Sequence, residues 1–222
     1  LGFSENFFYM CFGKAPSKEI IKAFDISLIL YAEHSFNVST FTARTITSSL
    51  SDIHSAITGA IGSLKGPLHG GANEEVMHMM NKIKKPENAL KWINNALDKK
   101  EVVMGFGHRV YKKGDSRVPT MEKYFKKVSK IKNDKKFLKI YDTVKNVMIE
   151  RKDIHPNVDF PTGPTYHLMG FDTDFFTPIF VISRITGWSA HIMEQHAANK
   201  LIRPLSKYSG EKHRKVMLLN QR

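Results

Sequence analysis

Apolar residues recur at intervals of three and four along most of this chain, the spacing that places them on one face of an α-helix. The stretch that Ser17 opens shows this period in Ile20, Phe24, Leu28 and Tyr31. No two alternating apolar runs are joined by a turn dipeptide such as Asn-Gly, so the sequence gives no sign of a β-hairpin. We therefore predict an all-α fold.

Further helices are expected over residues 39–64, from 71, over 86–97, from 119, over 134–151, over 166–169 and over 177–195. Small residues crowd the first of these, which is therefore predicted to pack closely in the core or at a subunit interface. The methionine cluster within 77–80 is predicted to fill the core. Gly187 is a candidate break in the last helix, and irregular structure is expected over 156–164 and after Asn199.

The chain of 222 residues, with 41% hydrophobic content, is long enough to bury a core. Its formal net charge of +13 admits three interpretations: a nucleic-acid surface, a solvated basic face, or a field that attracts anionic substrates. The lysines of residues 82–152 lie in helical segments with few aromatic residues among them. This favours the second and third interpretations over a nucleic-acid partner.

Several classes of site are not predicted. Cys11 is the only cysteine, which excludes an intrachain disulfide and a multi-cysteine metal site and fits a reducing compartment. The apolar runs are too short to span a bilayer, so no membrane partner is expected. Gly105 and Gly107 lack the third glycine of a dinucleotide-binding loop. His191 and His196 are five residues apart, a poor spacing for one helical face, so no metal site is predicted.

Three polar residues are flanked by glycine or proline: His69, His108 and Asp159. Such neighbours fix unusual backbone and let ligands approach closely, so we interpret the three as loop residues of one site. His69 precedes a predicted helix, and the positive end of that helix would keep the imidazole neutral and able to donate a hydrogen bond.

The neighbours of the other two residues suggest their chemistry. Apolar flanks, Val158 and Phe160, should make Asp159 a stronger base than it is in water. His108 lies near Arg117 in the sequence, from where it could polarise the carbonyl of an anionic substrate. Together with the arginines nearby in the sequence, these features suggest a functional site.

Three arginines, Arg117, Arg184 and Arg203, stand in motif-like stretches of a chain that is richer in lysine. The planar guanidinium binds carboxylates bidentately, so these residues are candidates for holding an anionic ligand. A structural ion pair is the alternative for each.

Five stretches, in this order, resemble the citrate synthase family: GPLHGGANEEVM, VVMGFGHRVYKKGDSRVPTM, HPNVDFPTGPTYHLMGF, FFTPIFVISRITGWSAHIMEQ and NKLIRPLSKYSG. The resemblance covers nearly all of the chain, which looks most like the bacterial 2-methylcitrate synthase branch. The resemblance implies condensation of acetyl-CoA or propionyl-CoA with oxaloacetate, the acyl-CoA being a co-substrate, with no permanently bound cofactor. Asp115-Ser116-Arg117 departs from the family's Asp-Pro-Arg but keeps the arginine.

The resemblance also implies residue roles. His69 would hydrogen-bond the thioester oxygen of the enolate, Asp159 would take the α-proton of the acyl-CoA, and His108 would polarise and protonate the oxaloacetate carbonyl. The expected oxaloacetate-binding residues are His34, Arg117, Phe180 and Arg184, with Arg203 reaching into the site of a partner subunit. The expected coenzyme A contacts are Val102, Val103, Gly105, Phe106, Gly107 and Asn157, with Lys152 near a phosphate.

A homodimer of two-domain subunits is implied as well. Residues 1–69 and 166–222 would belong to a large helical domain, incomplete in this chain, and residues 70–165 to a small helical domain with the coenzyme A loops. The first residues lack a basic signal segment and an initiator Met, so we expect the C-terminal portion of a longer chain. The cytoplasm is expected for a bacterial protein, with the mitochondrial matrix as the alternative.

Other functions stay open. The enzyme could be specific for acetyl-CoA, since one methylene in a pocket gives only about 1–3 kcal/mol of discrimination. A citryl-CoA lyase module of the same fold, a non-catalytic dimerisation fragment and a basic nucleic-acid module are the remaining alternatives.

Overall fold

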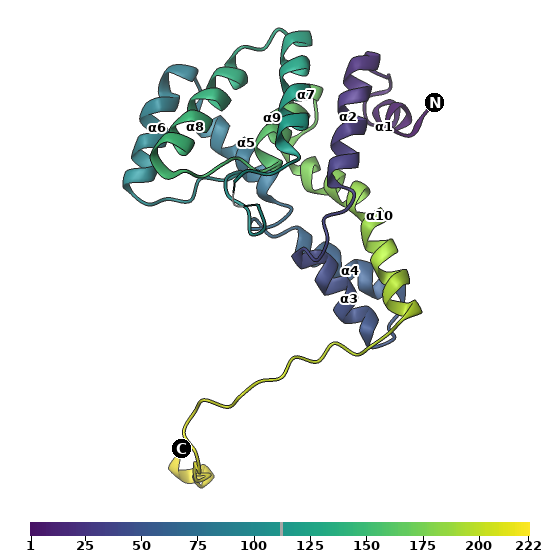
Figure 1. Ribbon diagram of the computed structural model, residues 1–222, viewed down its shortest axis with the longest axis vertical. Coiled ribbons are helices and arrows are strands. Elements are labelled where there is room, and N and C mark those ends of the chain that lie inside the picture. Colours follow the sequence, from purple (N-terminus) through teal and green to yellow (C-terminus); the bar gives the residue numbers. More distant parts are fainter. Residues whose placement is uncertain (112) are drawn as a thin grey trace.

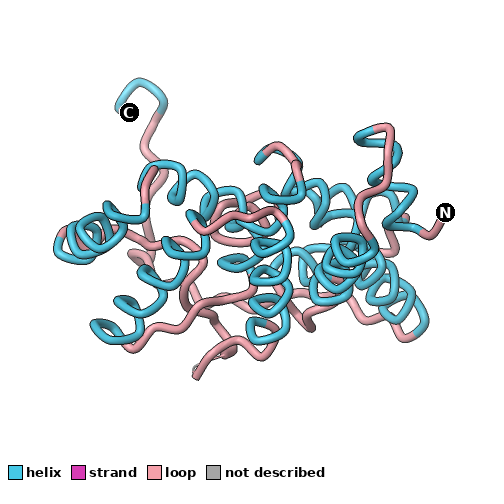
Figure 2. The backbone as a smooth tube through the Cα atoms, turned by 90° about the horizontal axis from the view of Figure 1, so that it is seen from above, coloured by secondary structure: helices cyan, strands magenta, loops and turns pink. Residues whose placement is uncertain are grey.

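The computed structural model describes residues 1–111 and 113–222 (Figure 1). Its elements are α1 (Phe3–Phe12), α2 (Lys18–Tyr31), α3 (Val38–Ser48), α4 (Ile53–Leu64), α5 (Ala72–Ile83), α6 (Pro86–Asp98), α7 (Val118–Ile131), α8 (Lys136–Lys152), α9 (Asp159–Met169), the 3₁₀ turn η1 (Thr173–Phe175), α10 (Phe176–Ala197) and the 3₁₀ turn η2 (Leu219–Gln221). Helices and loops, and no strand, make up these ranges (Figure 2), which confirms the all-α prediction. Across the same ranges, no helix combines the length and apolar character needed to cross a membrane.

The helices form two groups that α2 and α10 connect (Figure 1). In the first group, α9 packs against α5 and α7, and α8 packs against α6. In the second, α3 and α4 pack against each other and against α10. Helix α2 contacts both α7 and α10, and α1 packs on α2. Helix α2 therefore lies beside α7 and α10, two helices that are distant from it in the sequence.

Two of the predicted boundaries are wrong. Residues 39–64 do not form one helix, because the backbone turns at Leu50, whose φ is 65°, and α4 then starts afresh. Asp52 caps that start by accepting the backbone N–H of Ser55 at 2.9 Å. Residues 156–164 are not wholly irregular either, because α9 begins at Asp159. Its early proline, Pro161, is tolerated where the first helical N–H groups have no helical partner.

Two further differences concern the ends of the chain. Helix α10 continues through Gly187, where the sequence suggests a break, and α1 near the N-terminus is a helix that the sequence analysis does not predict. The chain after Asn199 is irregular as predicted, and Figure 1 shows it leading away from the helical body before it ends in η2.

The methionine cluster that the sequence analysis assigns to the core is buried: Met77, Met79 and Met80.

Close packing explains the glycine inside α10. Gly187 lies where α10 crosses the end of α2, and a Cβ there would press against the carbonyl oxygen of Ala32 and stand 3.2 Å from Cα of Glu33. The absence of a side chain, rather than backbone freedom, is what this position requires.

We expect Gly187→Ala to lower the free energy of unfolding by about 1–3 kcal/mol, because the added methyl group overpacks the crossing with α2. Gly62 in α4 is the matched control, since nothing lies within 4 Å of where its Cβ would stand. Gly62→Ala should leave stability unchanged or raise it by up to about 1 kcal/mol through helix propensity. Urea unfolding measures both, and equal effects would contradict the close crossing.

Candidate active site

Two histidines from separate loops meet at the centre of the molecule. His34 follows α2, and His108 follows the glycine-bearing loop before α7; their Nε2 atoms are 3.1 Å apart. The backbone N–H groups of Val110 and Tyr111 lie 3.1 and 3.2 Å from Nδ1 of His108, which therefore accepts. The ring proton of neutral His108 is thus on Nε2, directed toward His34.

The charge state of His34 follows from its surroundings. Burial first, then the guanidinium of Arg117, the ring of His108 and the guanidinium of Arg184 lower the pKa of His34 to about 4. The ring of Tyr111 stacks on His34 with centroids 5.5 Å apart. His34 is therefore neutral at pH 7 and can accept the proton of a neighbouring N–H.

The third histidine is oriented by α3. His69 lies in the turn between α4 and α5, and its Nε2 accepts the backbone N–H of Ser39 at 3.3 Å and lies 2.8 Å from Oγ of the same serine. Trp188 donates to that Oγ at 3.1 Å. The proton of neutral His69 is therefore on Nδ1. Burial, then Arg184 and His34, lower the pKa of His69 to about 4, so the predicted neutral state is supported, with burial as its first cause.

The carboxylate lies at a helix start rather than in a loop. Asp159 is the first residue of α9, and its backbone N–H donates to Oδ1 of Asn157 at 3.1 Å. Tyr31 donates its hydroxyl to Asp159 Oδ1 at 2.5 Å. Burial raises the pKa of Asp159 to about 6, against the opposing effects of Tyr31 and Arg117. The predicted increase in basicity is confirmed, and its cause is the predicted one.

A buried ion pair holds the first guanidinium. Asp115 accepts Nε and Nη2 of Arg117 at 3.0 and 2.7 Å, and its Oδ2 also accepts the backbone N–H of Val158 at 3.1 Å. Although burial alone would raise it, these bonds hold the pKa of Asp115 below its ordinary value. The same carboxylate thus fixes Arg117 and the residue that precedes Asp159.

The second guanidinium is buried within α10. Arg184 donates Nε to the carbonyl of Tyr31 at 2.6 Å and lies 4.8 Å above the ring of Phe180. Its Nη1 is buried and finds no hydrogen-bond partner among the described residues. Burial, then Arg117, lower the pKa of Arg184 to about 10. A buried, under-bonded guanidinium of this kind is suited to receive a carboxylate.

Phe180 joins the aromatic and imidazole groups. Its ring lies 4.0 Å from that of Tyr31 and 6.4 Å from that of His69, measured between centroids. Four sequence-predicted residues are therefore connected directly or through Tyr31: His69, Phe180, Arg184 and Asp159. His34 and His108 form a second pair, and Arg184 is near enough to His34 to lower its pKa. Arg117 connects to the same cluster through Asp115 and through its charge effect on His34.

The expected coenzyme A loop is fixed to the segment before α9. Gly107 donates its N–H to the carbonyl of His155 at 2.9 Å, and Asn157 donates its N–H to the carbonyl of Gly105 at 2.9 Å. Asn157 Nδ2 also donates to the carbonyl of Gly107 at 3.0 Å. Gly105 has a φ of +83°, and a Cβ there would stand 2.8 Å from Cβ of Phe160, so both backbone and packing require glycine.

The remaining predicted contacts differ in exposure. Val102 is exposed, whereas Val103 is buried in the core and can offer only its backbone to a ligand. Lys152 is exposed at the end of α8. Arg203 is exposed, and it belongs to the irregular segment that follows α10. Figure 1 shows that segment leading away from the helical body.

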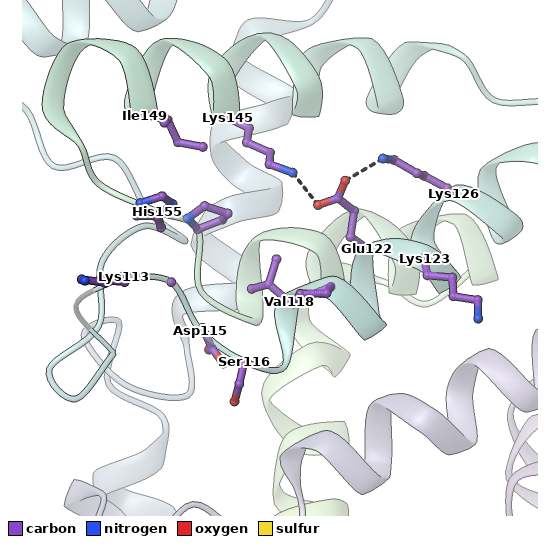
Figure 3. Close-up of a pocket in the computed structure, with 13 residues that line it drawn as sticks. Lys113, Asp115, Ser116, Val118, Glu122, Lys123, Lys126, Lys145, Ile149 and His155 are labelled. Carbon is purple, nitrogen blue, oxygen red and sulfur yellow. Dashed lines mark hydrogen bonds and ion pairs between the residues drawn. The ribbon is translucent and has the colours of Figure 1, made fainter.

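Two cavities adjoin the cluster. The smaller, about 210 Å³, is lined by His108 and Tyr111. The larger, about 730 Å³, lies between α7 and α8 and shares the walls 114–115 and 155–156 with it. Figure 3 shows Glu122 in the larger cavity with Lys126 and Lys145 on either side, each 2.6 Å from a carboxylate oxygen. Further lysines line it: Lys113 and Lys123.

Four residues of this site were not assigned from the sequence: Tyr31, Ser39, Tyr111 and Asp115. The helical period predicts that Tyr31 belongs to an apolar stripe and that Ser39 begins a helix. The available signal was proximity, since Tyr31 and Ser39 flank His34 by three and five residues. Within the described ranges, no group of three or more His, Cys, Asp or Glu side chains is arranged to hold a metal ion.

The fold and site together define a class of protein. A carboxylate with a raised pKa, neutral histidines and two guanidiniums lie within an all-α fold, an arrangement whose chemistry suits proton transfer on an anionic carbonyl compound.

Comparison with known proteins places the chain within that class. It matches the family model "Citrate synthase, C-terminal domain" over residues 1–205. It is 58% identical over 224 residues to 2-methylcitrate synthase 2 of Corynebacterium glutamicum, covering 99% of this chain and 58% of that protein. It is 57% identical over 217 residues to a citrate synthase of Mycolicibacterium smegmatis, covering 98% and 58%.

A solved structure agrees. The ternary complex of carboxymethyl coenzyme A and oxaloacetate with citrate synthase from Thermoplasma acidophilum superposes with a TM-score of 0.92 at 37% identity, covering 100% of this chain and 60% of that one. This chain belongs to the citrate synthase family. It spans less than two thirds of the length of these relatives.

The raised pKa of Asp159 predicts a pH-dependent cost in stability. Between its ordinary pKa of 3.8 and the folded value of about 6, the folded protein keeps a proton that the unfolded chain releases. The free energy of unfolding should therefore fall as pH rises through this window, by up to about 3 kcal/mol (roughly two units at about 1.4 kcal/mol each), and stay reduced above it.

Urea unfolding of wild type and Asp159→Asn between about pH 4 and pH 8 tests this. The variant should gain stability over wild type as pH rises to about 6 and keep a constant advantage above. His34 and His69, whose pKa values are lowered, act in the opposite sense as pH falls below 6.5, but they do so in both proteins. A difference that does not vary with pH would refute the raised pKa.

Proposed function

We propose that this chain carries the catalytic residues of an enzyme that condenses an acyl-CoA with oxaloacetate and then hydrolyses the product to release CoA. The observation that carries the proposal is the grouping of Asp159, His69 and His108, with the charge states and ring tautomers described above. Membership of the citrate synthase family supports it. The acyl group is acetyl, propionyl or both.

The proton inventory suits this reaction. Asp159, with a pKa of about 6, is mostly ionised at pH 7 yet more basic than an ordinary aspartate. It would remove the α-proton of the acyl-CoA, while Nδ1–H of His69 donates to the thioester oxygen as negative charge develops there. A neutral donor is sufficient for this, since its hydrogen bond strengthens as the enolate forms.

The second substrate would be activated by His108. Its Nε2–H, directed at His34 Nε2 in this structure, would donate to the ketone oxygen of oxaloacetate. As the enolate carbon attacks the ketone carbon, that oxygen takes the proton and becomes a hydroxyl. Water then cleaves the thioester, which leaves a tricarboxylate and the free thiol of CoA. Exclusion of bulk water protects the enolate until the carbon–carbon bond has formed.

The anionic groups of both substrates have candidate partners. Arg117 and Arg184 would receive the carboxylates of oxaloacetate, beside His34 and Phe180. The loop of residues 102–107 and Asn157 would hold coenzyme A, with Lys152 near a phosphate. Lysines line the larger cavity beside the site, where their charge could attract an anionic co-substrate.

We propose a homodimer in which Arg203 serves the site of the partner subunit, a role that suits its place on an extended segment. The packing of α5 to α9 on one another supports a small domain over 70–165, with 1–69 and 166–222 in a large one. The curated relatives described above come from bacteria, which favours the bacterial cytoplasm over the mitochondrial matrix.

Release of free thiol from acyl-CoA in the presence of oxaloacetate tests the function directly. We expect release by the purified protein with propionyl-CoA, acetyl-CoA or both, because the site binds the parts that these substrates share. Asp159→Asn should lower the rate at least about 100-fold, the contribution typical of a positioned general base.

The ratio of rates identifies the enzyme. A preference for propionyl-CoA would support 2-methylcitrate synthase, and a preference for acetyl-CoA would support citrate synthase. Thiol release that does not need oxaloacetate would contradict condensation. A folded protein with no release would support the non-catalytic alternative, and cleavage of citryl-CoA alone would support the lyase.

A further inference from the structure

The backbone that carries His34 is fixed by its own neighbours. Asn37 Nδ2 donates to the carbonyl of His34 at 3.2 Å, and the backbone N–H of Ser35 donates to the carboxylate of Glu33. Ser35 has a φ of 50°, a left-handed conformation that a residue with a side chain holds only where its surroundings fix it. The position of the His34 ring therefore depends on Glu33 on one side and Asn37 on the other.

Glu33 is in turn fixed by α10. Its Oε1 lies 3.0 Å from Nε2 of His191. One helical turn earlier on α10, Gly187 lets the backbone of Glu33 approach to 3.2 Å from where a Cβ would stand. Positions 187 and 191 share one face of α10, and both contact Glu33. The backbone of Glu33 packs against Gly187, and its carboxylate hydrogen-bonds to His191.

Arg44 of α3 sets the tautomer of that histidine. Its Nη1 lies 3.0 Å from Nδ1 of His191, 3.2 Å from the His191 carbonyl and 2.6 Å from Oε2 of Glu194. A guanidinium can only donate, so Nδ1 of His191 accepts and the ring proton lies on Nε2, facing Glu33. The imidazole thus donates a charge-assisted hydrogen bond to a carboxylate.

We propose that Glu33 and His191 are positioning residues for His34: their hydrogen bond fixes the turn after α2 so that the His34 ring meets oxaloacetate at the correct place. The inference rests on the proposed function, in which His34 binds oxaloacetate. Neither residue touches the reacting atoms. They act through the backbone of residues 33–35 and keep Nε2 of His34 within reach of His108.

Calorimetric binding of oxaloacetate, together with steady-state kinetics, tests the proposal. Glu33→Ala should raise the Kd for oxaloacetate about three- to tenfold, the effect of losing one partly exposed charge-assisted hydrogen bond. The KM for acyl-CoA should not change, because no contact of Glu33 reaches the loop of residues 102–107. Glu33→Gln should restore the Kd to within about twofold of wild type, since its amide oxygen can accept both N–H groups.

Glu194→Ala is the matched control. It removes a carboxylate that binds the same Arg44 and lies 3.9 Å from Nδ1 of His191. Among the described residues that carboxylate makes no contact with residues 33–35, so we expect a wild-type Kd. A wild-type Kd in Glu33→Ala would overturn the proposal. So would an equal loss in Glu33→Gln or in Glu194→Ala, because either would indicate a general loosening of the structure rather than positioning.

A second readout separates this inference from the proposed function. In protein labelled with ¹⁵N-histidine, the ring resonances of His34 should shift in Glu33→Ala and stay in place in Glu194→Ala, whether or not oxaloacetate binds. Unchanged His34 resonances would overturn the positioning role. Wild-type protein that binds no oxaloacetate but shows the His34 shift would instead contradict the proposed function and leave the backbone coupling supported.

Discussion

Asp115 accepts hydrogen bonds from the side chain of Arg117 and from the backbone N–H of Val158, so one buried carboxylate ties the start of α7 to the start of α9. Burying an ion pair costs solvation, and the cost is offset only when every partner is in place. Here the partners are the guanidinium of Arg117 and the backbone of Val158, the residue next to Asp159. The position of Asp159 relative to Arg117 therefore depends on the hydrogen bonds of Asp115. The sequence alone does not reveal these contacts.

The electrostatics of the site depend on that frame. Arg117 and Arg184 place two guanidiniums near His34, which is one reason that its pKa is lowered to about 4. The same proximity, after burial, lowers the pKa of Arg184 to about 10. A dianionic ligand between the guanidiniums would relieve this repulsion, so the free site favours binding of such a ligand. Once bound, the ligand would also weaken the main electrostatic reason that keeps His34 neutral.

The helices and the two histidine loops could be predicted from sequence because their signals are local: apolar spacing of 3.6 residues, and glycine or proline beside the polar group. The break near Leu50 and the start of α9 at Asp159 could not. A leucine gives no sign in the sequence that its backbone is left-handed, whereas a proline in the first turn of a helix resembles a loop signal. The contacts of Tyr31 were missed for another reason. It meets Asp159 across 128 positions in the sequence, and such pairing follows from how α2 crosses the other helices.

The end of α2 shows why that crossing matters for chemistry. Tyr31 donates its hydroxyl to Asp159 and accepts Arg184 at its carbonyl, and His34 follows three residues later. One helix end thus orients a base, a guanidinium and an imidazole at once. The tyrosine bond also opposes the rise in pKa that burial causes at Asp159. The basicity of the carboxylate is therefore a balance between burial and one short hydrogen bond, and the same helix end that positions the base also moderates it.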